Sequence, residues 1–395
     1  MLTVFLAFLR LGLTSFGGPV AHLGYFRAEF VERRRWLTEQ AYADLVGFCQ
    51  ILPGPASSQV AIGIGLRHAG LASAFAAWIG FTAPSAVAMV LAAYGIADFG
   101  AAMAPWLHGL RVIAVAVVAL AVWTMARSLA PDRLRAAVAV AAVAIVFAVP
   151  GPAGQVGAIV LGAIVGRIFG LPDDPHALAI SGSDGKKRRL AVVALTLFVL
   201  LLAALPVLAN TQGNQALRLF DAFYRSGSLV FGGGHVVLPL LRAEVVPSGW
   251  VSDGAFMSGY GLAQAMPGPL FSFAAYLGAA SGPEPHGWLG GALAIVAIYL
   301  PSFLLVIGIL PFWEGLRGGE STRSALRGIN ASVVGLLLAA LFDPVWITAI
   351  HSRADFMLAA VALLLLGLWK VPAWLVVVLG AVAGYALDRA ATLLG

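Results

Sequence analysis

The chain has 395 residues, of which 61% are hydrophobic and only 11% are charged, and its mean hydropathy is +0.93. Soluble domains carry about 25% charged residues, so this composition excludes a fold with a water-covered surface. We expect an all-α polytopic membrane protein, because helices satisfy their own backbone in lipid. The net charge of +6 is attributed to membrane orientation, and no nucleic-acid partner is expected. A single cysteine, Cys49, excludes an internal disulfide and a cysteine-built metal cluster.

The chain begins with an apolar stretch that resembles a signal peptide. It lacks a basic first region and contains Arg10, so we interpret it as a first helix that stays in the mature protein. About 12–13 membrane segments are expected along the chain, since about 20 residues span a bilayer. In chain order they lie near residues 4–25, 41–66, 71–94, 108–127, 136–149, 154–169, 190–209, 218–241, 255–279, 288–312, 326–342, 355–369 and 372–392.

The second half of the chain repeats the first. The stretch FLRLGLTSFGG at Phe8–Gly18 aligns with FYRSGSLVFGG at Phe223–Gly233, and the WLTEQAY stretch from Trp36 aligns with WVSDGAF from Trp250. The stretches APSAVAMV and LPSFLLVI, from Ala83 and Leu300, align later. Further aligned residues are Arg27 with Arg242, Glu29 with Glu244, Gln50 with Gln264, and Pro53-Gly54-Pro55 with Pro267-Gly268-Pro269. This shared order indicates duplication of one helical unit.

We therefore expect an N-terminal repeat over residues 1–170 and a C-terminal repeat over residues 215–395. Residues 171–214 form a polar linker and an unpaired apolar helix, which would flip the second unit and give an inverted repeat. The positive-inside rule places clusters of basic residues in the cytoplasm. If the basic stretch Lys186–Arg189 is cytoplasmic, the other basic clusters are cytoplasmic as well, except Arg33–Arg35. Either these three arginines attract anions from outside, or the Pro-Gly-Pro segments are re-entrant hairpins; a spanning but broken helix is the preferred prediction.

Each Pro-Gly-Pro segment interrupts an apolar run at membrane depth. Proline removes a backbone donor, so such a break is tolerated only where the backbone lines a cavity. The second half-helix then presents free N–H groups and a positive dipole end, which favour an anion. Hydroxyl and amide groups near the breaks offer further hydrogen bonds. The predicted binding set is Gln50, Pro53, Gly54, Pro55, Ser57, Ser58, Gln264, Pro267, Gly268, Pro269 and Ser272. The alternative is a kink that only shapes helix packing.

Two arginines lie inside apolar runs, each shortly before a Gly-Gly pair. Arg10 and Arg225 offer the planar guanidinium that suits oxyanions, and a charge in the membrane is a functional hypothesis by default. The glycines would let backbone N–H groups approach a ligand; they are Gly17, Gly18, Gly232 and Gly233. The alternatives are an arginine that reaches the membrane interface and glycines that allow close helix packing.

Other polar residues are candidates for coupling to protons. They are Asp44, His22, His235, Glu29 and Glu244. The histidines could equally be structural, and the glutamates could form ion pairs at the membrane edge. The sequence contains no Walker motif, no paired histidines at ligand spacing and no nucleophile with a base at motif spacing. We therefore expect no cofactor, no metal site, no ATP drive and no enzyme activity.

The SFGGP segment at Ser15–Pro19, the FGGGH segment at Phe231–His235 and the twin Pro-Gly-Pro segments resemble those of the chromate ion transporter (CHR) family. The chain is similar to its long, two-domain form. The resemblance implies export of chromate across the cytoplasmic membrane of a bacterium, giving chromate resistance, and a link to sulfate.

The residues by themselves predict a secondary transporter for a divalent tetrahedral oxyanion, coupled to the proton gradient or to anion exchange. The expected partners are chromate or sulfate and the lipid bilayer, with a possible homodimer. Two alternatives remain, namely a sulfate or related oxyanion uptake transporter and a passive anion channel.

Overall fold

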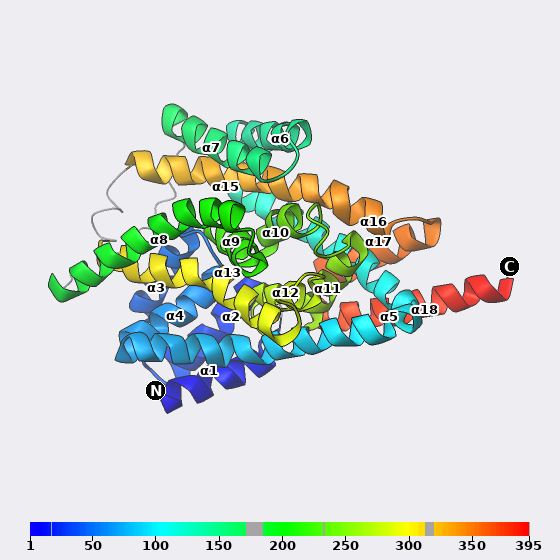
Figure 1. Ribbon diagram of the computed structural model, residues 1–395, viewed down its shortest axis with the longest axis horizontal. Coiled ribbons are helices and arrows are strands. Elements are labelled where there is room, and N and C mark those ends of the chain that lie inside the picture. The colour runs from blue at the N-terminus through cyan, green and yellow to red at the C-terminus, as the bar shows by residue number, and fades with distance from the viewer. Residues whose placement is uncertain (17, 171–184, 232–233, 313–319, 395) are drawn as a thin grey trace.

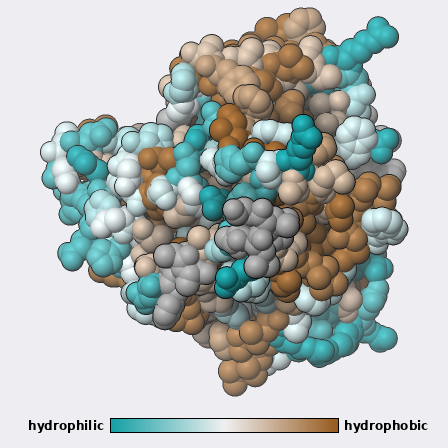
Figure 2. Space-filling view, turned by 90° about the vertical axis from the view of Figure 1, so that its right-hand side faces the viewer, coloured by the Kyte–Doolittle hydropathy of each residue, from teal (hydrophilic) through white to brown (hydrophobic). Residues whose placement is uncertain are grey.

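The structure is a computed structural model that describes all residues except 17, 171–184, 232–233, 313–319 and 395. Its described residues form helices joined by short turns and contain no strand, as the composition predicts. The long helices run roughly along the horizontal axis of Figure 1. Viewed from one end of that axis, hydrophilic side chains spread over the face and hydrophobic ones gather in patches near its edges (Figure 2).

Helices of the first repeat fill the predicted segments in order. They are α1 (Leu2–Thr14), α2 (Gly18–Arg27), a π-helical turn (Ala28–Arg33), α3 (Glu39–Ile51), α4 (Ala56–Ala69), α5 (Leu71–Leu129), α6 (Arg133–Ala148) and α7 (Pro152–Phe169). The extra helix is α8 (Gly185–Gln212).

The second repeat follows the same order. Its helices are α9 (Gln215–Leu229), α10 (Val237–Val245), α11 (Asp253–Ala265), α12 (Phe273–Ala280), α13 (Gly287–Ile309), α15 (Glu320–Ala340), α16 (Ile347–Ala349), α17 (Arg353–Gly367) and α18 (Ala373–Leu394). Equivalent helix starts use the same chemistry: Thr38 caps α3 by accepting from the Ala41 N–H, and its partner Ser252 caps α11 by accepting from the Ala255 N–H.

The Pro-Gly-Pro segments break their helices, but the two halves do not continue in one direction. The Arg67 guanidinium near the end of α4 lies 3.4 Å from the Ala41 carbonyl at the start of α3. In the second repeat the Tyr276 hydroxyl on α12 donates to the Ala255 carbonyl on α11 at 2.9 Å. Both pairs of half-helices are therefore hairpins, with the Pro-Gly-Pro at the tip. The preference for a spanning broken helix was wrong, because the half-helices pack on each other.

The segments predicted near 4–25 and 218–241 are hairpins as well. The ring of Phe8 on α1 stacks on Phe30 in the turn after α2, with centroids 4.7 Å apart. Arg225 on α9 donates to Glu244 on α10 at 3.1 Å. Each repeat thus contributes two hairpins of short helices.

Five helical stretches of the described chain are long and apolar enough to cross a membrane. They are Leu71–Asp98, Met103–Leu129, Arg188–Gln212, Gly287–Phe312 and Arg323–Ala349. The first two belong to α5, which turns back between them (Figure 1). The protein is therefore a multi-pass membrane protein, and several of the predicted segments enter it as half-length helices.

The two repeats are inverted relative to each other. The first span of α5 is equivalent to α13 in the repeat, and the two helices pack side by side. Phe75 stacks on Phe303 at 4.6 Å near one end, while Tyr94 lies 6.4 Å from Trp288 near the other. Equivalent spanning helices therefore run antiparallel, which requires a symmetry axis in the membrane plane.

The hairpins also place the arginines that disagreed with the positive-inside rule. The Trp36 ring, next to Arg33–Arg35, stacks on His68 at 4.1 Å, just before α5 begins. Arg188 at the start of α8 lies over the Phe312 ring, which follows the C-terminal end of α13. That end of α13 lies beside the start of α5, since Phe303 stacks on Phe75 there. All of these basic residues therefore lie at one end of the molecule, and the rule is satisfied.

Candidate functional site

The tips of the hairpins meet where α5 crosses α13. The Gly54 N–H donates to the Val230 carbonyl at 2.6 Å, and the Gly268 N–H donates to the Ser15 carbonyl at 2.9 Å. Gly54 is equivalent to Gly268, and Ser15 is equivalent to Val230, so the repeats exchange the same hydrogen bond. Each Pro-Gly-Pro tip is thereby held against the interrupted helix of the other repeat.

Both tip positions require glycine. Gly54 has φ of +125° and Gly268 has φ of +98°, a region that side chains with a Cβ rarely adopt. A Cβ on Gly54 would lie 2.6 Å from the Ser302 hydroxyl, and one on Gly268 would lie 2.9 Å from the Ser85 hydroxyl. Each tip therefore sits directly on a serine of a spanning helix.

Ser85 and Ser302 are further candidate site residues that the sequence alone did not indicate. They are equivalent in the repeat, and the alignment of APS with LPS was the signal that could have found them. The Ser85 hydroxyl donates to the Thr82 carbonyl, whereas the fully buried Ser302 hydroxyl has no partner among the described residues. The Ser15 hydroxyl is also fully buried, and the described part of the chain offers it no partner either. A buried hydroxyl without a partner is costly, so both are candidates to bind a ligand.

The predicted serines lie at the starts of the second half-helices. Ser57 and Ser58, in the first turn of α4, are buried. Ser57 faces the His22 ring at 3.4 Å, and Ser58 faces the Tyr299 hydroxyl of the other repeat at 3.4 Å. Ser272 is already engaged with the Pro269 carbonyl at 2.8 Å. All three predicted serines therefore already have a hydrogen-bond partner in the structure.

Helix starts add positive potential at the same place. Pro55 precedes α4 and Pro269 precedes the 3₁₀ turn Leu270–Ser272 that leads into α12, and neither start has a side-chain cap. Helix α2 begins at Gly18, after α1 has ended at Thr14. In the second repeat the Ser272 N–H already donates to the Pro269 carbonyl at 3.0 Å, so the start of α4 is the better candidate for an anion-binding helix start.

The predicted glutamines differ from each other. Gln50 is exposed, whereas Gln264 is half-buried and its side-chain N–H group finds no partner in the described part of the chain. A third glutamine, Gln59, was missed: it donates to the Pro53 carbonyl at 2.7 Å and so fixes the first tip. Pro267 is half-buried at the second tip. Gly17, Gly232 and Gly233 lie outside the described residues.

The two intramembrane arginines have unlike surroundings. Arg225 donates to Asp221 at 2.7 Å and to Glu244 at 3.1 Å. Arg10 is exposed on α1, which favours the membrane-interface interpretation for that residue. The structure therefore does not bring Arg10 and Arg225 together as a symmetric pair around one site. Arg225 lies less than two helical turns before Val230, whose carbonyl accepts from the first tip.

The other candidates for coupling have partners of their own. His22 is buried between the Ser15 carbonyl, at 3.2 Å, and Ser57. His235 lies 2.7 Å from the Tyr260 hydroxyl. Glu29 pairs with Arg34 at 2.6 Å and with Arg33 at 3.2 Å, and buried Asp44 accepts weakly from Gln40 at 3.4 Å; these are the pairings expected of membrane-edge residues. His22 contacts the first tip region through Ser57, and the turn that carries His235 packs on the Leu270–Ser272 turn after the second tip.

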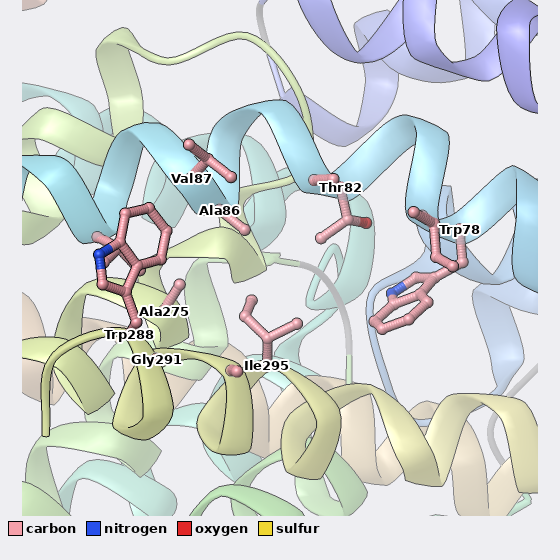
Figure 3. Close-up of a pocket in the computed structure, with 12 residues that line it drawn as sticks. Trp78, Thr82, Ala86, Val87, Ala275, Trp288, Gly291 and Ile295 are labelled. Carbon is pink, nitrogen blue, oxygen red and sulfur yellow. The ribbon is translucent and has the colours of Figure 1, made fainter. Parts of the chain in front are cut away.

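A cavity of about 220 Å³ lies along the seam between α5 and α13. Figure 3 shows its wall, with Trp78, Ala86 and Val87 on one side and Trp288, Gly291 and Ile295 on the other. Thr82 contributes a hydroxyl, but the wall is otherwise apolar. A dianion would find almost no partners there, so this cavity is not the candidate binding site. Its lining includes the exposed side chains of Val87 and Trp288, so it opens to the outer surface of the molecule.

Comparison with known proteins identifies relatives over the whole chain. A chromate transport protein of Pseudomonas aeruginosa is 29% identical and covers 94% of this chain and 87% of its own length. A probable chromate transport protein of Synechococcus elongatus is 25% identical over 95% of this chain and 93% of its own. The uncharacterized transporter YwrA of Bacillus subtilis is 30% identical; 90% of it matches only 40% of this chain, about the length of one repeat.

No solved structure matches the chain. The sequence model of the family described as "Chromate transporter" matches twice, at residues 2–170 and 217–385. These two ranges fall within the predicted repeats and together cover most of the chain. The chain therefore belongs to the chromate transporter family.

Proposed function

We propose that this protein is a secondary transporter that exports chromate across the cytoplasmic membrane of a bacterium. One observation carries the proposal beyond the family: the reciprocal contact between each Pro-Gly-Pro tip and the opposite repeat, Gly54 to Val230 and Gly268 to Ser15. It gathers helix starts and serine hydroxyls from both repeats at one place. Donors of this kind suit the oxygens of a tetrahedral dianion.

Chromate would be bound between the tips by backbone N–H groups and serine hydroxyls. Ser302 and Ser15 would supply hydroxyl donors that have no partner among the described residues. Ser57 and Ser58 would supply two more at the start of α4 by exchanging their contacts with His22 and Tyr299 for the anion. Arg225, which pairs with Asp221 and Glu244 in this structure, would supply positive charge when these carboxylates release it. Binding of the anion would replace the Gly54 and Gly268 hydrogen bonds, so that each tip either binds the opposite repeat or the substrate.

Movement of one repeat against the other would alternate access to this site. The two repeats contact each other along the seam between α5 and α13, where such a movement would take place. The basic end of the molecule would face the cytoplasm. A dianion is expelled by an inside-negative membrane potential, by about 2.3 kcal/mol per charge per 100 mV, which supports the export direction.

Sulfate uptake is the second candidate, since sulfate has the same charge and shape and would make the same contacts. A passive channel is less consistent with the fold, because a channel needs no hydrogen bonds that join two inverted repeats at the site. A homodimer stays a prediction.

Uptake of chromate into inverted membrane vesicles tests the proposal. Sulfate is added as a competitor, and a proton gradient is imposed or collapsed. Saturable accumulation of chromate that sulfate inhibits is the expected result. Absence of chromate accumulation, together with strong sulfate entry into right-side-out vesicles, would replace export by uptake. A flux that never saturates would replace the transporter by a channel.

A further inference from the structure

A second polar cluster lies beside the candidate site and contains two carboxylates but only one guanidinium group. Arg225 is shared by two carboxylates, Asp221 at 2.7 Å on its own helix and Glu244 at 3.1 Å on α10. The side chains of Asp221 and Glu244 are only 8% and 14% exposed. With both acids ionised the cluster has a net charge of −1, which is unfavourable in a poorly solvated place.

No other charge in the described surroundings balances this excess. On α10, Arg242 is already paired with Asp253 at 2.8 Å and with Asp343 at 3.5 Å. Arg218 on α9 faces the Ala209 carbonyl of α8. The parts of α8 and α13 that pack on α9 carry no charged side chain. Helix α8 has none after Arg189, and α13 has none between Gly287 and Ile309, where Tyr299 is the one titratable group.

The first repeat lacks this arrangement, although it is built from the same unit. Leu6 stands where the second repeat has Asp221, and Arg10, the equivalent of Arg225, is exposed. Glu29, the equivalent of Glu244, pairs with Arg33 and Arg34 instead. The shared guanidinium is therefore a special feature of the second repeat, and duplication alone does not explain it.

We propose that Asp221 and Glu244 form the proton-binding site of the transporter, and that they compete with the oxyanion for Arg225. This inference rests on the proposed function. When both acids are ionised they hold the guanidinium. When one of the two acids binds a proton, the cluster becomes neutral. One edge of the Arg225 guanidinium then becomes available to an oxyanion at the tips, which lie past Val230 at the end of α9.

Competition for one cation fixes the sign of the coupling. A proton on the acid pair raises the affinity for the anion, and by reciprocity the bound anion raises the affinity of the acid pair for a proton. Proton and oxyanion therefore move in the same direction. One proton with one dianion leaves a net charge of −1, so the membrane potential still favours export, whereas an inward proton gradient alone drives uptake.

The test uses proteoliposomes that contain the full-length protein, with chromate inside and outside at equal concentration. Acidifying the outside should drive chromate inward in the wild type, by up to about tenfold per pH unit for each coupled proton. The Asp221→Asn/Glu244→Gln variant should still exchange labelled for unlabelled chromate, but the accumulation driven by the pH gradient should fall to none. Protein-free vesicles correct for leakage.

Asp253→Asn is the matched control, because it removes a carboxylate from a neighbouring arginine without touching Arg225. It should keep the wild-type response. If the double variant does not fold, Asp221→Asn and Glu244→Gln are compared singly. A wild type that does not exchange chromate would refute the proposed function. A wild type that exchanges chromate, with acid variants that still respond to the gradient or with accumulation on the acidic side, would refute the acid pair alone.

Discussion

Ser302 is the residue whose substitution tests the candidate site most simply. It is fully buried, unpaired and in contact with the first tip, so its removal should weaken chromate binding without disturbing packing. A hydrogen bond to a charged group contributes about 1.5–3 kcal/mol, so Ser302→Ala should raise the KM for chromate about tenfold or more. Ser281→Ala removes another buried, unpaired hydroxyl that lies after α12, and its KM should stay at the wild-type value. Equal KM values in the two variants would remove Ser302 from the site.

Gly54 gives a second test at the residue scale. Gly54→Ala would place a Cβ at φ of +125°, a strain of about 1–2 kcal/mol, and against the Ser302 hydroxyl and the Gln59 amide. The tip must shift, so chromate transport should fall at least tenfold while the protein still reaches the membrane. Gly47→Ala in the same hairpin meets open space and should transport normally. Normal transport by Gly54→Ala would show that the tip does not hold the substrate.

The hairpins make a sharp prediction at the scale of the element. If α3 and α4 form a re-entrant hairpin, then Arg35 before it and Gly70 after it face the same side of the membrane. Single cysteines at positions 35 and 70, in a Cys49→Ser background, should both react with an impermeant thiol reagent in inverted vesicles. Neither should react in right-side-out vesicles. Reaction from opposite sides would restore the spanning helix.

These elements also show how much of the fold can be predicted from the sequence. The Pro-Gly-Pro breaks, the duplicated unit and its inversion all follow from apolar runs and aligned motifs, because helix breaks and membrane spans leave strong local signals. The fold-back of α3 on α4 does not, since a broken helix and a hairpin have the same composition. Arg33–Arg35 carried the one hint, through their conflict with the positive-inside rule.

Site residues were predictable to the extent that they are local. Ser57 and Ser58 follow a break and could be assigned to a helix start. Ser302 lies against Gly54 only because the repeats cross, and Glu244 reaches Arg225 only because α10 folds back on α9, whereas Asp221 pairs with Arg225 locally, four residues earlier on α9. Contacts between distant segments depend on packing, which a single sequence does not display.

The inverted seam gives a prediction for the whole molecule. If transport requires the repeats to move, a bond between α5 and α13 should stop it. Cysteines replacing Phe75 and Phe303, whose rings are in contact, should be joined by a short, reducible bifunctional thiol reagent, which should abolish chromate transport until the link is reduced. The same reagent should join cysteines replacing Trp36 and His68, whose rings are in contact within the first repeat, without stopping transport. Transport by the linked Phe75–Phe303 variant would argue for a channel.

The most direct test of an oxyanion site between the two tips is equilibrium binding of radiolabelled chromate to the purified protein. The wild type and Gly47→Ala should bind chromate saturably, with displacement by unlabelled chromate, and the Gly54→Ala/Gly268→Ala variant should bind none while remaining folded. Wild-type binding by the double variant would place the substrate elsewhere in the molecule. Absence of binding by the wild type would contradict the site altogether.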